Sequence, residues 1–255
     1  MTPEPDFDLI LTRDPDQIAA AQALRYRVFV TELGGGGDGV DHHAGCESDR
    51  FDPLCTHLIL RDRNRAPGDR VVGTYRLLDG DGATAAGGFY TEAEYDLTPL
   101  HASGRRLLEL GRSCLHPDYR GGAAMFHLWQ ALAAHVKAQG IDILFGVASF
   151  HGTDPDALAA PLSILHHRHL APAALRVTAR PPNGIAMDRL ADGAYDRAAA
   201  MREVPALIKG YLRLGGVVGQ GAWIDRAFNT TDVCLLMETA RLTDRARAIY
   251  DRPRA

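Results

Sequence analysis

The sequence predicts an α/β fold in which helices flank a central mixed sheet. Strand-like and helix-like segments alternate over the first 150 residues. A strand, a turn and a helix occupy Glu109–Gly140, and Ile141–Phe150 follows with the dense apolar pattern of a strand covered on both faces. No linker-like boundary interrupts the alternation. We therefore expect one domain over residues 1–255, in which residues from about 151 to 255 complete the sheet.

The first two elements have readable boundaries. A short apolar strand, Phe7–Thr12, comes first. Asp14 has an N-cap residue type and is followed by proline, which favours a helix start. Apolar spacing extends this helix to about Leu33. The glycine run that follows, and the absence of apolar periodicity as far as Pro53, predict a flexible loop over 34–53.

Three further strands and a second helix follow this loop. Turn-forming residues join the strands Cys55–Arg61 and Arg70–Leu78. The next strand is Arg106–Leu115. A helix opens near Asp118, and Gly140 is placed to end it.

The remaining chain is less regular. We expect helices over 156–170 and 201–214, and a strand over 175–180. Two extended segments, 217–228 and 231–239, are joined by a turn at Asn229 and Thr230. Residues 83–104 are rich in glycine and acids and show little periodicity.

Composition excludes several classes of protein. The net charge of −4 makes a broad nucleic-acid-binding face unexpected. The acidic N-terminus has no long apolar run, and no stretch approaches the roughly 20 apolar residues of a membrane span. We therefore expect a cytoplasmic protein, at most peripheral to the inner membrane face.

Cysteine and histidine spacing argues against a structural metal. The four cysteines are irregularly spaced and indicate reduced thiols. No zinc-site spacing is present in the cluster His42, His43, Cys46, Cys55 and His57. No metal site is predicted.

Glu109 and Arg112 are charged residues inside an otherwise apolar strand. Strand alternation places them on opposite faces, but Gly111 between them is typical of a bulge. A bulge brings both side chains to one face and splays the strand from its neighbour. The gap can admit a thin ligand that pairs with a strand edge, such as a pantetheine arm. The alternative is a buried ion pair that only fixes the sheet.

The turn after this strand contains Gly121 and Gly122 and leads into a helix. Glycines allow close approach of backbone to a ligand, and free N–H groups at a helix start suit a phosphate. A plain turn is the alternative. Cys114 has no readable His–Asp partners, which favours a buried structural thiol over a nucleophile.

Three carboxylates follow the glycine run: Glu47, Asp49 and Asp52. Together they can bind a cationic amine and help deprotonate it. A solvated acidic loop is the alternative. Arg76 lies inside an apolar strand, and we expect it to pair with these acids.

In combination these residues resemble the pattern of acyl-homoserine lactone synthases. The closer resemblance is to the ornithine N-acyltransferases of bacterial ornithine-lipid synthesis. It covers most of residues 20–240 and is carried by the segments LRYRVFVTELG, DRFDPLCTHLILRD, ELGRSCLHPDYR, FGVASFHG and PALIKGYLRLGGVVGQGAWIDRAFNTTDVCLLM.

The resemblance implies a GNAT-like, mostly antiparallel sheet with a bulged strand near residue 111. It implies transfer of a 3-hydroxyacyl chain from acyl carrier protein to the α-amine of ornithine, giving lyso-ornithine lipid. The donor arrives on the carrier's phosphopantetheine, and no other cofactor is implied. Acetyl-CoA-dependent relatives carry a glycine pattern after the bulged strand that Arg120–Met125 only partly matches. That departure favours a carrier-protein donor over free CoA.

The expected roles are catalysis, contact with the carrier protein, substrate binding and donor binding. Glu47 or Glu109 is the expected base, with Arg112 as the third catalytic residue. Arg120 is expected to meet the acidic carrier protein. Expected substrate-binding residues are Arg25 and Phe29, which share a helix face, with Asp49, Asp52 and Arg76. Expected donor-binding residues are Ser113, Cys114, Leu115, Tyr119, Arg120, Gly121 and Gly122.

Other readings stay open. The same fold also serves acyl-homoserine lactone synthases and acyltransferases for glutamine, glycine or another amine. A reading from another class is a catalytically silent module that binds acyl groups or carrier protein and regulates lipid synthesis.

Overall fold

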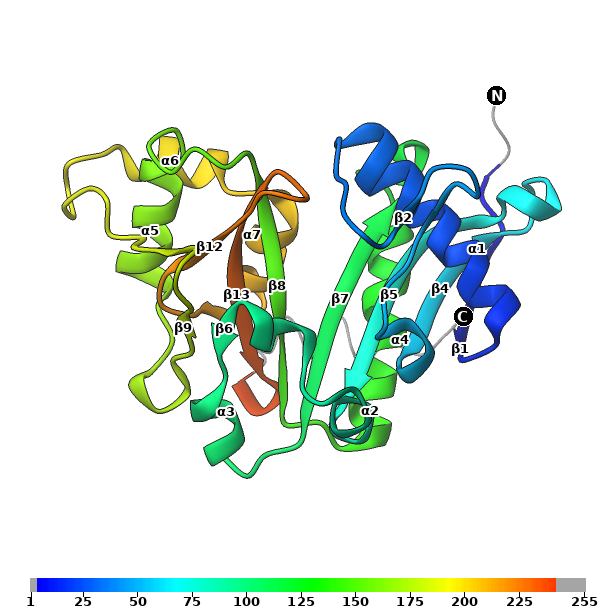
Figure 1. The fold of residues 1–255 in the computed structure, drawn as a ribbon, viewed down its shortest axis with the longest axis horizontal. Coiled ribbons are helices and arrows are strands. Elements are labelled where there is room, and N and C mark those ends of the chain that lie inside the picture. The colour runs from blue at the N-terminus through cyan, green and yellow to red at the C-terminus, as the bar shows by residue number, and fades with distance from the viewer. Residues whose placement is uncertain (1–3, 242–255) are drawn as a thin grey trace. The chain divides into compact units, whose positions relative to one another are not determined.

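The computed structural model describes residues 4–241, which form two compact units (Figure 1). Within the described range, unit 1 comprises residues 4–88 and 110–140, and unit 2 comprises 89–109 and 141–241. Neither unit is one continuous stretch of chain, because strand β7 begins in unit 2 and ends in unit 1.

Unit 1 contains the first four strands of the main sheet. Their spatial order is β1-β4-β5-β7, with antiparallel pairing of β1 to β4 and of β4 to β5. The bounds are Phe7–Thr12 for β1, Thr56–Asp62 for β4, Val71–Asp79 for β5 and Leu107–Leu115 for β7. All four expected strands are therefore present, with ends within a residue or so of prediction.

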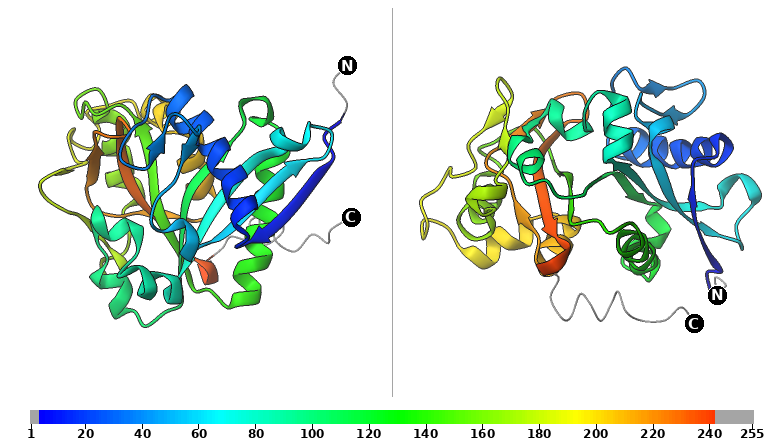
Figure 2. Two further views of the ribbon diagram at one scale, coloured as in Figure 1. Left: turned by 45° about the vertical axis from the view of Figure 1, so that its right-hand side comes forward. Right: turned by 90° about the horizontal axis from the view of Figure 1, so that it is seen from below.

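Two helices cover opposite faces of this sheet, as the right-hand view of Figure 2 shows. They are α1, Pro15–Arg25, and α4, Ala124–Gln139. Asp14 caps α1 as expected, accepting bonds from the backbone of Asp16 and Gln17. Gly140 ends α4, as expected, in the left-handed conformation with φ 60°.

Close packing between α4 and the sheet depends on Gly73. A Cβ at this position would lie 2.7 Å from Leu115 Cδ2 and 2.9 Å from Leu128 Cδ1. A side chain here would force Leu115 and Leu128 to shift. On the other face, Ile59 packs with Ala21 and Leu24 of α1. β4 and β5 are therefore buried along almost their whole length, because a helix packs on each face of the sheet.

The first helix differs from prediction in its second half. The α-helix ends at Arg25 and continues as a π-helix over Tyr26–Glu32. Leu33 then closes it by donating to the carbonyls of Val28 and Val30. Apolar spacing does not distinguish the two forms over so short a segment.

Residues 34–53 are an ordered segment, so the expectation of a flexible loop is wrong. Strand β2, Val40–Asp41, pairs with β3, Cys46–Glu47, and a 3₁₀ turn, Asp52–Leu54, follows. The Asp41 carboxylate accepts two backbone N–H bonds at 2.9 Å within the hairpin turn. Polar side chains, rather than apolar periodicity, order this segment.

Unit 2 continues the sheet from the first half of β7. Residues 107–109 pair in parallel with β8, Ile143–His151. β8 then pairs antiparallel with β13, Thr230–Glu238. Beyond β13 lie β12, Ala222–Asp225, and β10, Gly184–Ile185, while β11, Val217–Val218, also pairs with β13. The turn expected before β13 is present, with Asn229 at φ 53°.

The remaining elements are short. The expected strand over 175–180 is reduced to β9, Thr178–Ala179, which pairs with β6, Tyr95–Asp96. The expected helix over 201–214 is two helices separated at Pro205. The helices not yet bounded are α2 Gly80–Ala86, α3 Thr98–Ala102, α5 Ala159–His169, α6 Arg197–Glu203 and α7 Ala206–Arg213; the 3₁₀ turns are Pro67–Asp69, Tyr90–Ala93, Pro117–Tyr119, Ala173–Leu175 and Thr239–Arg241.

The predicted fold class is confirmed: the protein has a mixed α/β fold with a large, mostly antiparallel sheet flanked by helices. Strand β7 is irregular near residue 111. Its parallel pairing with β8 ends at Glu109, and Arg112 has a φ of 49°, which is uncommon outside glycine. Among the described residues, none of the helices combines the length and apolar character needed to cross a bilayer.

Candidate active site

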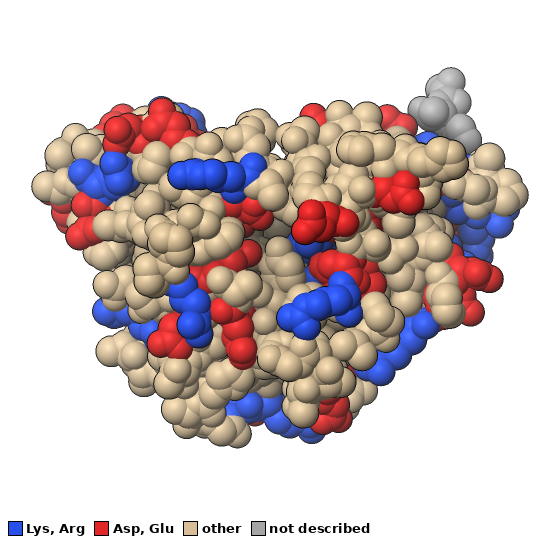
Figure 3. All heavy atoms as spheres, in the orientation of Figure 1, with Lys and Arg blue, Asp and Glu red and all other residues tan. Residues whose placement is uncertain are grey.

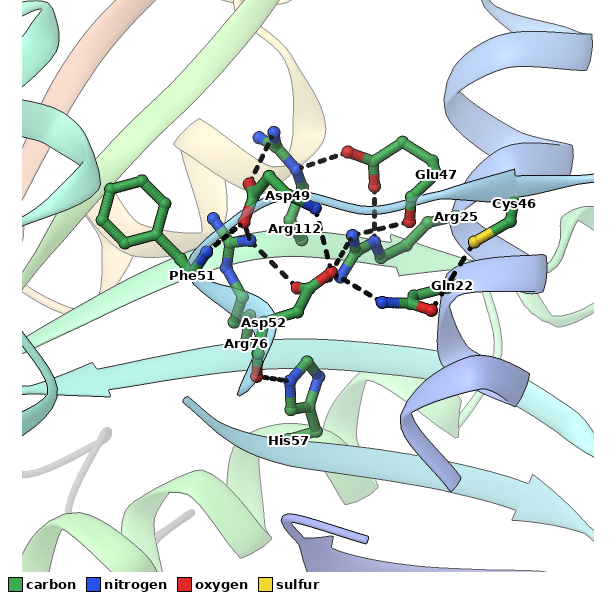
Figure 4. Close-up of polar contacts among 10 residues, drawn as sticks. All are labelled: Gln22, Arg25, Cys46, Glu47, Asp49, Phe51, Asp52, His57, Arg76 and Arg112. Atoms are coloured by element: carbon green, nitrogen blue, oxygen red, sulfur yellow. Dashed lines mark hydrogen bonds and ion pairs between the residues drawn. The ribbon is translucent and has the colours of Figure 1, made fainter. Parts of the chain in front are cut away.

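Unit 1 buries a network of alternating cations and anions (Figure 4). We call it the arginine–carboxylate network. Each member bonds at least one oppositely charged member, and three positive charges balance three negative ones. Its members are Arg25, Glu47, Asp49, Asp52, Arg76 and Arg112.

Arg25, the last residue of α1, is the centre of the network. Its Nε lies 2.5 Å from Glu47 Oε2, and its Nη2 lies 2.7 Å from the Glu47 carbonyl oxygen. Nη1 and Nη2 reach the two carboxylate oxygens of Asp52 at 2.7 and 2.8 Å. The side chains of all three residues are at most 3% exposed. Burial at this level requires such complete pairing.

Asp52 joins Arg25 to Arg76, as predicted for the arginine in the apolar strand. Arg76 Nη1 lies 3.0 Å from Asp52 Oδ1 and 2.5 Å from Asp49 Oδ1. Burial raises the pKa of Asp52, but the hydrogen bond and charge of Arg25, together with the charge of Arg76, outweigh it and hold that pKa well below 3.8. The pKa of Asp49 is lowered in the same way, by Arg76 and Arg112 against burial.

Glu47 and Asp49 connect the network to strand β7 through Arg112. Arg112 Nε lies 3.1 Å from Glu47 Oε1, and its Nη2 lies 3.2 Å from Asp49 Oδ2. Both carboxylate oxygens of Glu47 therefore bond a guanidinium group. The left-handed conformation of Arg112 accompanies this orientation.

Uncharged neighbours complete the arrangement. Gln22 Nε2 donates to Asp52 Oδ2 at 2.8 Å. His57 Nε2 lies 3.0 Å from the Asp52 carbonyl oxygen, and burial lowers the pKa of this imidazole. The Arg76 guanidinium lies 5.6 Å from the centre of the Phe51 ring. The sequence analysis missed these roles, because a polar helix residue or a strand histidine has no local signal for them.

Glu109 is anchored within unit 2. Its Oε1 accepts the N–H of Thr91 at 2.6 Å, and its Oε2 accepts the N–H of Tyr90 at 2.8 Å. The residue is 3% exposed. Two successive amides at the start of a 3₁₀ turn thus fix both carboxylate oxygens.

Strand β13 adds a second set of buried polar residues in unit 2. Asp232 is 4% exposed and Glu94 is 2% exposed. The buried Tyr95 hydroxyl lies 3.0 Å from the carbonyl oxygens of Gly221 and Asp232. Sequence analysis missed this set, because the helix and strand pattern is weakest in this part of the chain.

Two of the expected site residues are packed in the core of unit 1. Phe29 lies in the π-helix, so its spacing from Arg25 is not that of an α-helix, and it packs against a core cluster. Cys114 belongs to the same cluster, and burial raises the pKa of its thiol to about 12. A thiol in this environment is a poor nucleophile.

The turn expected to bind the donor has mixed features. Gly121 has φ 75°, and helix α4 begins after Ala123, which offers no side-chain acceptor to the first N–H groups. Arg120 is paired: its guanidinium reaches both carboxylate oxygens of Glu32 at 2.5 and 2.8 Å. Tyr119 donates to Asp62 at 2.6 Å. Ser113 is half-buried and Leu115 is buried.

Comparisons with known proteins agree with this fold. The profile of the acetyltransferase (GNAT) domain matches residues 24–130. The L-ornithine N(alpha)-acyltransferase of Rhodobacter capsulatus is 58% identical over 96% of this chain and 95% of its own length. The protein of the same name from Brucella abortus is 42% identical over 91% of this chain and 84% of its own.

Solved structures share the fold at low identity. A CoA-dependent acyl-homoserine lactone synthase with SAM and isopentyl-CoA has a TM-score of 0.52 at 15% identity, covering 98% of this chain and 89% of that one. FeeM, an N-acyl amino acid synthase from uncultured soil microbes, has a TM-score of 0.55 at 12% identity, covering 94% of both. These structures show the fold, and the identities of 58% and 42% to the Rhodobacter capsulatus and Brucella abortus proteins show that this chain is an acyltransferase belonging to the family of the L-ornithine N(alpha)-acyltransferases.

Proposed function

We propose that this protein transfers a 3-hydroxyacyl chain from the phosphopantetheine of an acyl carrier protein to the α-amine of L-ornithine, giving lyso-ornithine lipid. Ornithine as the acceptor rests on one observation, the 58% identity to the Rhodobacter capsulatus relative over nearly the whole of both chains. The network of unit 1 and the anchored Glu109 support the chemistry.

The reaction forms one bond and breaks another. The neutral α-amine attacks the thioester carbonyl, the C–N bond forms, and the C–S bond breaks to release the phosphopantetheine thiol. The amine must lose a proton, and a carboxylate takes it directly or through water. Backbone N–H groups of the irregular strand β7 stabilise the negative charge that develops on the carbonyl oxygen.

Glu109 is the better base of the two expected from the sequence. Both oxygens of Glu47 bond guanidinium groups, and this side chain is 1% exposed. Protonating Glu47 would break two ion pairs in a buried place. The Glu109 oxygens accept hydrogen bonds from the backbone N–H groups of Tyr90 and Thr91, which carry no net charge. We assign Glu47 to holding Arg25 and Arg112.

Asp49 and Arg112 are the members of the network best placed to meet the amino acid. Their side chains are 19% and 14% exposed, against at most 3% for the other four. Ornithine carries two ammonium groups and one carboxylate. We assign Asp49 to an ammonium group and Arg112 to the carboxylate, because these charges are complementary.

The turn before α4 suits the donor's phosphate. Gly121 and Gly122 add no side chain, and Ala123 leaves the first N–H groups of the helix without a side-chain cap. The Arg120 side chain is 43% exposed although it is paired with Glu32. On the face drawn in Figure 3, acidic and basic side chains are interspersed. Carrier docking at the turn before α4 would involve the exposed Arg120 and weaken with salt.

The test is a matrix of donors and acceptors. Purified protein is incubated with 3-hydroxyacyl carrier protein or 3-hydroxyacyl-CoA, each with ornithine, lysine, glutamine or glycine, and products are identified by mass. We expect product with ornithine and carrier protein at a rate well above every other combination. Faster turnover with CoA would overturn the donor, and faster turnover with another amino acid would overturn the acceptor.

A further inference from the structure

A surface hollow of about 350 Å³ lies within unit 2, and none of its lining residues has a role in the proposed acyl transfer. Its apolar wall includes Pro99 of α3, Pro172 just before the 3₁₀ turn Ala173–Leu175, and Leu175 at the end of that turn, which packs against α3. The volume falls at the lower end of the roughly 300–1,000 Å³ of small-molecule sites. The hollow is therefore large enough for a small organic molecule or a headgroup.

Two arginines share one carboxylate at this hollow. Glu238, the last residue of β13, is 13% exposed, and its Oε1 lies 2.7 Å from Arg241 Nε. Its Oε2 pairs with Arg105 Nη1. One carboxylate thus holds two guanidinium groups in place on the lining of the hollow.

These two arginines retain unused hydrogen-bonding capacity. Arg105 and Arg241 are 42% and 66% exposed. Arg105 donates to Glu238 through Nη1, Arg241 forms an ion pair with it through Nε, and within residues 4–241 no other acceptor bonds either guanidinium. The three side chains together carry one net positive charge. An anion entering the hollow would meet several N–H groups already oriented by Glu238.

We propose that this hollow binds a phosphate group, as part of a small phosphate ester or of a phospholipid headgroup. Guanidinium groups match phosphate oxygens in forked pairs, and a tetrahedral phosphate offers enough oxygens to bond two guanidinium groups at once. The apolar wall of Pro99, Pro172 and Leu175 accommodates the carbon part of the ester. The site does not depend on the proposed reaction, and its test does not require activity.

Phosphate binding is measured first with soluble probes. The backbone amide signals of the ¹⁵N-labelled full chain are followed by NMR during titration with inorganic phosphate or glycerol 3-phosphate, with sodium chloride replacing them at equal ionic strength. We expect saturable shifts at Ser103, Arg105, Leu175 and Glu238 with the phosphates alone. Affinity should be weak and fall with salt, because both arginines are largely solvated.

Variants locate the site. Arg105→Gln and Arg241→Gln should each weaken phosphate binding several-fold, and the double variant about tenfold or more. The matched control is Arg202→Gln, which removes an exposed arginine of α6 and should leave binding unchanged. Unfolding midpoints of all variants should match the parent, because the pairs removed are partly exposed. Equal shifts with chloride, or unchanged shifts in the double variant, would overturn the proposal.

Vesicles separate the two sources of phosphate. The protein is sedimented with phosphatidylglycerol vesicles and, separately, with phosphatidylcholine vesicles. Binding to phosphatidylglycerol alone, lost in the double variant, would assign the hollow to an anionic lipid headgroup. Phosphate shifts without vesicle binding would assign it to a soluble phosphate ester. Either result supports the proposed site.

Discussion

Arg25 and Asp52 form a two-pronged ion pair inside unit 1, with Nη1–Oδ1 and Nη2–Oδ2 distances of 2.7 and 2.8 Å. The pair ties the end of α1 to the segment before β4. Because Asp52 also meets Arg76, and Arg25 also meets Glu47, this pair connects both ends of the arginine–carboxylate network. The arrangement of the more exposed Asp49 and Arg112 therefore depends on a buried pair that need not touch the substrate.

Replacing Arg25 by glutamine should destabilise the protein by about 3–5 kcal/mol, because it leaves two buried carboxylates without their shared cation. Urea denaturation measures the change. The matched control is Arg27→Gln, because the side chains of Arg27 and its partner Asp69 are each about a third or more exposed. This substitution should lower the free energy of unfolding by about 1 kcal/mol or less. Equal losses for both variants would show that the network is not a buried unit.

The pair also sets an acid dependence of stability. In the folded protein the pKa of Asp52 lies below its ordinary value of 3.8. The ionised Asp52 therefore contributes fully to the free energy of unfolding above pH 3.8, and this contribution is lost as the pH falls below 3.8 toward the lower pKa of the folded state. Asp52→Asn should therefore be less stable than the parent at pH 7, and the difference should shrink toward pH 3. Chemical denaturation across this range measures it, with Asp81→Asn as the exposed control. A constant difference would contradict the assigned linkage.

Local signals in the sequence predicted the scaffold well. Asp14, Gly140 and strand Phe7–Thr12 are found where capping and periodicity place them. Pairing of Arg76 with nearby acids was also predictable, because a charge in an apolar strand needs a partner. These features depend on neighbours in sequence or on a single residue type.

Features that depend on distant contacts were not predictable. The ordered segment 34–53 looked flexible because ion pairs to α1, β5 and β7, rather than apolar spacing, hold it in place. The buried Glu94 and Asp232 lie on elements with weak patterns. The π-helix after Arg25 was missed because apolar spacing over seven residues does not distinguish it from an α-helix.

Asp49 should affect substrate use more than stability. Asp49→Asn removes the most exposed acid of the network, so KM for ornithine should rise about tenfold or more while the unfolding free energy falls less than in Arg25→Gln. Steady-state kinetics with ornithine as the varied substrate measure the effect, and Asp81→Asn is the control. An unchanged KM would remove Asp49 from the acceptor site.

Glutamine substitutions of the two candidate bases, Glu109 and Glu47, should have different effects on kcat and on stability. Glu109→Gln should lower kcat about 10²–10⁴-fold and flatten the acid limb of the pH–rate profile, if it removes the proton acceptor. Glu47→Gln should act chiefly through stability, because this side chain holds two arginines. If Glu109→Gln keeps parental kcat while folded Glu47→Gln loses it, the assignment is reversed.

The central claim is acyl transfer from a carrier protein to the α-amine of ornithine. The most direct measurement uses ornithine labelled with ¹⁵N at the α position, 3-hydroxyacyl carrier protein and purified protein, with the product fragmented in a mass spectrometer. We expect a lyso-ornithine lipid whose acyl-bearing nitrogen is the labelled one. An acyl chain on the unlabelled side-chain nitrogen, or no acylated ornithine at all, would contradict it.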